Sequence, residues 1–82
     1  MTEKNTNLEK YDEVFCSTFM VGKEDLSDLK YQDVEAWDSV GHMNMIAELE
    51  DAFEIEMDID DIIDFTDYQT GKEMVSKYGI EL

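Results

Sequence analysis

The sequence has no proline and contains a single cysteine and a single histidine among its 82 residues. One cysteine cannot form an internal disulfide, and one cysteine with one histidine cannot supply the four Cys and His ligands of a structural zinc site. A chain of this length is near the lower limit for a domain with its own hydrophobic core. We therefore expect one domain over residues 1–82, stabilised by packing alone.

Long apolar runs are also missing. No stretch approaches the roughly 20 apolar residues of a membrane-spanning helix. Residues 1–7 contain no apolar core of the kind found in a secretory signal. We expect a cytoplasmic monomer that does not insert into membranes.

Positive charge is scarce, with six basic residues against 22 acidic ones and a formal net charge of −16. Such a chain repels nucleic acid and favours basic patches on other proteins, although the charge could also serve solubility alone. The apolar fraction is 43%, with one Trp, four Tyr and four Phe, which favours a folded chain over a disordered one.

Apolar residues recur with the period of an α-helix in several segments. They predict long helices over residues 7–20, 38–53 and 66–78 and a short one ending near residue 63. Residues 21–38 form a long connection that we expect to pack onto the core, and no segment shows the sustained alternation of a strand. The prediction is an all-α, small four-helix bundle with a long loop between its first two helices.

The second predicted helix has two distinct faces. We expect one face to pack into the core: Met43, Met45, Ile46, Leu49 and Phe53. The other face places small apolar residues among carboxylates: Val40, Asn44, Ala47, Glu48 and Asp51. This composition is typical of a shallow docking surface, and an ordinary solvated face is the alternative.

Ser39 and His42 would be neighbours on this helix, which raises the possibility of a Ser-His nucleophile. A hydrolase also needs an oxyanion site, a group that orients the imidazole and a pocket that excludes water. A small bundle with a filled core has little room for them. We expect no enzyme here and place His42 at the edge of the core.

The acidic run of residues 58–64 invites comparison with a calcium-binding loop. Such a loop needs an oxygen ligand at its fifth position and glycine at its sixth, where this run has Ile62 and Ile63. The sequence predicts no metal site.

Asp38 and Ser39 open the second helix, where a serine is most simply an N-cap. The same position also suits an attached phosphate, because free N–H groups and the positive end of the helix dipole lie there. Both roles stay open from these residues alone.

Residues 37–53, from Trp37-Asp38-Ser39-Val40-Gly41 to Leu49-Glu50-Asp51-Ala52-Phe53, resemble the phosphopantetheine-attachment segment of acyl carrier proteins. The shared pattern is an Asp-Ser-aliphatic triplet that opens a helix, followed by an aliphatic and acidic run. The similarity continues through Ile55-Glu56-Met57 and Thr66-Asp67-Tyr68 and covers nearly the whole chain at the level of pattern.

The resemblance implies that a phosphopantetheinyl transferase attaches 4′-phosphopantetheine from coenzyme A to Ser39, and that Asp38 lies beside the group. The thiol of the arm, rather than Cys16, would carry acyl or aminoacyl groups as thioesters between acyl-loading and acyl-transfer enzymes, in fatty-acid or other lipid biosynthesis or a specialised pathway. The bundle could shelter a short acyl chain. The resemblance implies a docking surface for enzymes with basic patches, formed by Val40, Ala47, Glu48, Glu50 and Asp51.

The chain also departs from the family pattern. Val40 stands where leucine is usual, and Trp37 with His42 and Met43 makes the segment more similar to discrete carriers of specialised pathways. The alternative function is an unmodified acidic adaptor whose second helix binds a basic protein.

Overall fold

The computed structural model describes residues 3–82 and contains four α-helices and one 3₁₀ helix. They are α1 (Glu3–Phe19), η1 (Lys23–Asp25), α2 (Ser39–Phe53), α3 (Ile59–Asp64) and α4 (Tyr68–Lys77). Residues 3–82 contain no β-strand, and the predicted all-α bundle with a long first loop is confirmed. None of the helices in this part of the chain is long and apolar enough to cross a membrane.

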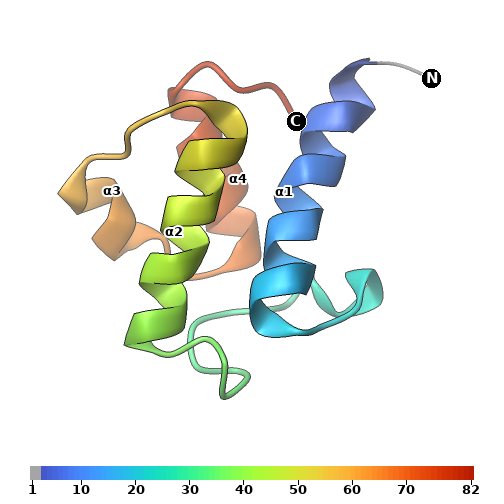
Figure 1. Cartoon of the computed structure of the whole chain (residues 1–82), viewed down its shortest axis with the longest axis vertical. Helices are drawn as coiled ribbons and strands as arrows, with labels where there is room; N and C mark the ends of the chain where they lie inside the picture. Colours follow the sequence, from blue (N-terminus) through green and yellow to red (C-terminus); the bar gives the residue numbers. More distant parts are fainter. Residues whose placement is uncertain (1–2) are drawn as a thin grey trace.

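In Figure 1, α1 lies along one side of the molecule, with α2 and α4 beside it and α3 on the side away from α1. The first helix begins earlier than its periodic apolar residues suggested. It ends at Phe19, one residue before the predicted limit, because Met20 adopts a left-handed conformation with φ of 58°.

A cluster of aromatic rings fills the space between α1, the long loop and α4. Phe15 lies at its centre and is fully buried. Its ring centroid is 4.9 Å from that of Tyr11 and 5.5 Å from that of Trp37. The other rings around it are Phe19, Phe65 and Tyr68.

The aromatic cluster requires a glycine in α4. A Cβ atom at Gly71 would collide with the Phe65 ring and the Tyr11 hydroxyl. Next to Gly71, the Tyr11 hydroxyl donates a hydrogen bond of 2.6 Å to the Tyr68 carbonyl. The helix-propensity cost of Gly71 is therefore offset by close packing of two aromatic side chains against the α4 backbone.

The long loop packs onto the core as predicted, since Leu29 and Trp37 are buried. It is also joined to the α3–α4 junction by an antiparallel bridge. The Tyr31 N–H donates to the Thr66 carbonyl and the Tyr68 N–H donates to the Leu29 carbonyl, both at 2.9 Å. This pairing brings Tyr31 and Thr66 together although they are far apart in the sequence.

The predicted inner face of α2 is correct for four of its five residues, since Met45, Ile46, Leu49 and Phe53 are buried. The prediction is wrong for Met43, which is 49% exposed. At 100° per residue, Met43 lies about 60° around the helix from Ile46, towards α3 rather than α1. The space between α2 and α3 is not filled, so Met43 borders a pocket.

Candidate functional site

The start of α2 is capped by Asp38 and not by Ser39. The Asp38 carboxylate accepts a hydrogen bond of 2.8 Å from the Gly41 N–H, and the Asp38 backbone is extended as an N-cap requires. Ser39 is the first helical residue, and its side chain is exposed. The interpretation of Ser39 as an N-cap is therefore wrong, and the cap does not use its hydroxyl.

Gly41 holds the preceding loop close to the first turn of α2. A Cβ atom at this position would overlap the carbonyl oxygen of Ala36, so no larger residue fits without moving the loop. The sequence alone did not predict a role for Gly41. A role could have been inferred from its position, because glycine is a poor helix former and Gly41 lies in the first turn of a helix, two residues after Ser39.

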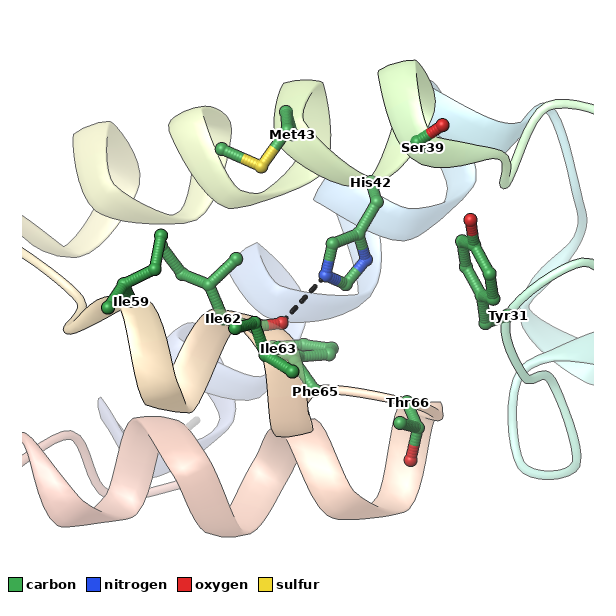
Figure 2. Close-up of a pocket in the computed structure, with 9 residues that line it drawn as sticks. All are labelled: Tyr31, Ser39, His42, Met43, Ile59, Ile62, Ile63, Phe65 and Thr66. Carbon is green, nitrogen blue, oxygen red and sulfur yellow. Dashed lines mark hydrogen bonds between the residues drawn. The ribbon is translucent and has the colours of Figure 1, made fainter.

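A pocket of about 270 Å³ lies between α2, α3 and the long loop (Figure 2). Ser39, Tyr31 and Thr66 contribute to its lining beside apolar side chains from α2, α3 and the α3–α4 junction. The remaining lining residues are His42, Met43, Ile59, Ile62, Ile63 and Phe65. None of the lining side chains is acidic, lysine or arginine, in a chain with a net charge of −16.

His42 projects from α2 towards α3, and both of its ring nitrogens are engaged. Its Nδ1 accepts a hydrogen bond of 3.0 Å from the indole N–H of Trp37. Its Nε2 lies 2.9 Å from the Ile62 carbonyl oxygen, which can only accept (Figure 2). These partners assign the neutral tautomer with the proton on Nε2. His42 is half-buried, as expected for the core edge, and neither nitrogen is available to activate Ser39.

Four of the five residues implied as a docking surface are exposed on α2. Val40 is 69% exposed, and Ala47, Glu48 and Asp51 are also exposed. Glu50 differs, since it is half-buried and its carboxylate accepts a hydrogen bond of 2.9 Å from the Met57 N–H. Glu50 thus links α2 to the segment that leads into α3.

The wall that α3 contributes to the pocket is formed by isoleucines. Ile59 and Ile63 of α3 are each 67% exposed. They are four residues apart and share one face of the helix, while Asp61 lies on the opposite face and is buried. The sequence carries no signal for this exposure, because Ile59, Ile62 and Ile63 have the i, i+3, i+4 spacing of residues that usually face a core.

The candidate site therefore consists of the exposed Ser39 at the start of α2, a pocket without charged lining residues next to it, and exposed acidic residues on the outer face of α2. These features are read from the sequence and structure of this chain, without comparison to another protein. No protein-family model matches this sequence, and no curated protein or solved structure matches it either.

Proposed function

We propose that this chain is an acyl carrier protein that bears 4′-phosphopantetheine on Ser39. The observation that carries the proposal is the position of Ser39, exposed in the first turn of α2, unused by the cap and at the edge of an apolar pocket. When bound, the group supplies a thiol at the end of a flexible arm, on which acyl groups are carried as thioesters.

The start of α2 fits a phosphodiester. The first turn of a helix presents unpaired N–H groups and the positive end of the helix dipole. The first turn of α2 contains no acidic residue. In a chain with 22 acidic residues, this local absence of acids favours an attached phosphate. Asp38 is the one acidic residue next to Ser39, and its carboxylate is engaged by the Gly41 N–H.

The pocket favours an apolar acyl group over a charged aminoacyl group. Met43, Ile59 and Ile63 line it with partly exposed aliphatic surface. Transfer of each methylene from water to such a surface stabilises by about 0.8 kcal/mol. An ammonium group would lose its hydration there without a carboxylate among the lining residues to replace it.

The exposed face of α2 fits docking to basic partners. Val40 and Ala47 are small apolar residues beside the carboxylates of Glu48 and Asp51. Opposite charges across such an interface raise the association rate more than the affinity. We propose that this face binds the phosphopantetheinyl transferase and the acyl-loading and acyl-transfer enzymes.

The test is intact-mass spectrometry after incubation with coenzyme A, Mg²⁺ and a phosphopantetheinyl transferase of broad specificity. We expect the mass of one phosphopantetheine to be added to the native chain and to Ser76→Ala, a control at another exposed serine. We expect no addition to Ser39→Ala. If a known carrier is modified alongside and the folded native chain is not, the proposal fails and the acidic adaptor becomes the better explanation.

A further inference from the structure

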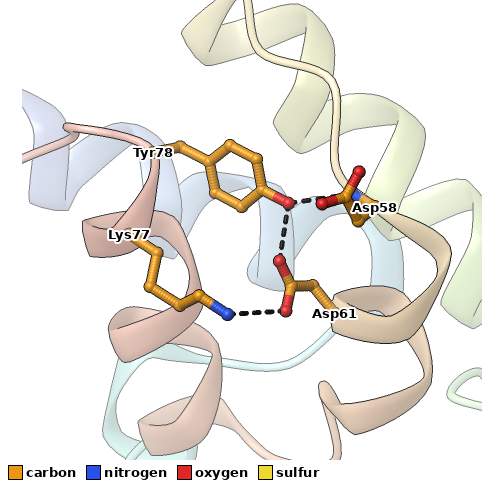
Figure 3. Close-up of polar contacts among 4 residues, drawn as sticks. All are labelled: Asp58, Asp61, Lys77 and Tyr78. Carbon is orange, nitrogen blue, oxygen red and sulfur yellow. Dashed lines mark hydrogen bonds and ion pairs between the residues drawn. The ribbon is translucent and has the colours of Figure 1, made fainter.

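Tyr31 differs from the other three tyrosines in the use of its hydroxyl. The hydroxyls of Tyr11, Tyr68 and Tyr78 all donate hydrogen bonds to oxygen atoms of the chain. Figure 3 shows the example of Tyr78, whose hydroxyl donates to the Asp61 carboxylate at 2.6 Å. The Tyr31 hydroxyl makes no hydrogen bond within the part of the chain that the structure describes, and the residue is 38% exposed. This hydroxyl can therefore donate to a group outside the chain.

The Tyr31 side chain is held in the lining of the pocket although it comes from the long loop. Its backbone is fixed, because the Tyr31 N–H donates to the Thr66 carbonyl at 2.9 Å. Its ring meets the His42 ring edge to face, with 5.9 Å between centroids and an interplanar angle of 77°. In Figure 2 the hydroxyl end of Tyr31 points towards the first turn of α2, where Ser39 lies. The donor is thus positioned by the fold of the unmodified chain.

The other polar side chains in the lining of the pocket are not suited to donate towards Ser39. Both ring nitrogens of His42 are engaged in hydrogen bonds within the chain. The Thr66 hydroxyl points away from Ser39 in Figure 2. None of the described lining residues is lysine or arginine. Among these residues, Tyr31 is the one that directs an unused donor towards Ser39.

We propose that Tyr31 is a positioning residue whose hydroxyl donates a hydrogen bond to the phosphodiester attached to Ser39. The inference rests on the proposed carrier function and adds a specific donor to it. A phosphodiester is negatively charged at neutral pH, and hydrogen bonds to an ionised partner are roughly twice as strong as those between neutral groups. The hydroxyl would hold the phosphodiester on the side of α2 that faces the pocket, since both Tyr31 and Ser39 line that pocket.

The first test is ³¹P NMR of the modified, full-length chain. The same chain unfolded in urea gives the reference resonance of a phosphodiester without tertiary contacts. We expect the phosphorus resonance of the native chain to be displaced on folding and Tyr31→Phe to lose most of this displacement. The reason is that one hydrogen bond to a charged group changes the population of the bound orientation by about tenfold. Tyr68→Phe is the matched control, because it removes a tyrosine hydroxyl outside the pocket, and we expect it to keep the native displacement.

Urea unfolding of the same variants without phosphopantetheine separates positioning from folding. We expect Tyr31→Phe to unfold at the native urea concentration, because the hydroxyl makes no hydrogen bond within the described part of the chain. We expect Tyr68→Phe to unfold at a lower concentration, because its hydroxyl donates to the Asp12 carboxylate. A lower midpoint in Tyr31→Phe would overturn the proposal by assigning its hydroxyl a structural role.

A third measurement needs no variant, so it decides the question even if Tyr31→Phe does not fold. We expect a heteronuclear Overhauser contact between the Tyr31 ring protons and the phosphorus atom of the native modified chain. If intact mass shows that Ser39 is modified, an absent contact would overturn the role of Tyr31 and leave the carrier function standing. Equal phosphorus displacements in the native chain and Tyr31→Phe would do the same. If the native chain accepts no phosphopantetheine while a known carrier does, both proposals fail.

Discussion

The two halves of this bundle use apolar residues in opposite ways. On the side of α1 and α4, aromatic rings fill the interior so completely that α4 requires a glycine at position 71. On the side of α2 and α3, isoleucines line a pocket. Polar contacts with Lys77 and His42 attach α3, which carries these isoleucines. The first half is closely packed, while the second leaves a pocket between its helices.

Trp37 joins the two halves. Its ring stacks on Phe19 at 4.7 Å between centroids and an interplanar angle of 13°. Its indole N–H donates to His42, which contacts α3. The residue is fully buried although it lies in the long loop. The aromatic cluster thereby fixes the orientation of one contact that attaches α3 to α2.

The largest difference between the halves is expected from truncating one apolar side chain in each. Phe15→Ala removes a fully buried ring that lies against five other aromatic rings. We expect a loss of about 3–5 kcal/mol in the free energy of unfolding. Ile59→Ala removes a side chain that is already 67% exposed, and we expect a change within about 0.5 kcal/mol.

Urea unfolding followed by circular dichroism at 222 nm measures both values. The far-UV spectrum of each folded variant serves as the control for retained helix content. Comparable losses in the two variants would contradict the difference between the two halves of the bundle, because they would mean that apolar packing anchors α3.

A smaller effect is expected at the start of α2, where two adjacent residues have different roles. Asp38→Ala removes the carboxylate that caps the helix, and we expect a loss of about 1 kcal/mol. Ser39→Ala removes an exposed hydroxyl that the cap does not use, and we expect a change within about 0.5 kcal/mol. Thermal unfolding of both variants tests this order. A larger loss in Ser39→Ala would return the serine to a capping role.

The sequence was sufficient to predict the all-α bundle and most of its helices, because their apolar residues repeat with the helical period. Tyr11, Val14, Phe15 and Phe19 follow that period and are buried. The predicted limits of the last helix, 66–78, lie within two residues of those of α4, because Asp67 is its N-cap and Gly79, at φ of 87°, follows its last turn. Helices defined by period and caps are predictable from neighbouring residues alone.

The pocket was not predictable in this way, because it depends on contacts between distant segments. Tyr31 reaches it through the bridge to Thr66, and Asp61 is buried because Lys77 and Tyr78 arrive from α4. Helical period places Ile59 and Ile63 on one face but does not say which face meets the core. Ser39 was predicted as a candidate site from the sequence. That Asp38, and not Ser39, caps α2 is seen only in the structure.

The smallest effect is expected from a change of pH. Hydrogen bonds from Lys77 and then Tyr78 hold the pKa of the Asp61 carboxyl below its usual value, and the same contacts with Asp61 raise the pKa of Lys77 and of Tyr78. Asp58, the N-cap of α3, and Asp64, its last residue, are the other acidic groups near Asp61, Lys77 and Tyr78. A lowered pKa means that the folded state favours the ionised carboxylate.

The contacts of Asp61 with Lys77 and Tyr78 should therefore contribute their full stability above the unfolded-state pKa of aspartate, about 3.9, and lose it as the pH falls through the lower folded-state value. Relief of repulsion among the 22 acidic residues acts in the opposite direction, and it is common to the native chain and its variants. The informative quantity is the difference in unfolding free energy between the native chain and Asp61→Asn, measured with urea from pH 7 to pH 2. We expect this difference to shrink below about pH 4, whereas the difference for Asp60→Asn, a control at an exposed acid of the same helix, stays small throughout. A native advantage that persisted unchanged at pH 2 would show that α3 is held by packing rather than by its ion pair, and the contrast between the two halves of the bundle would then disappear.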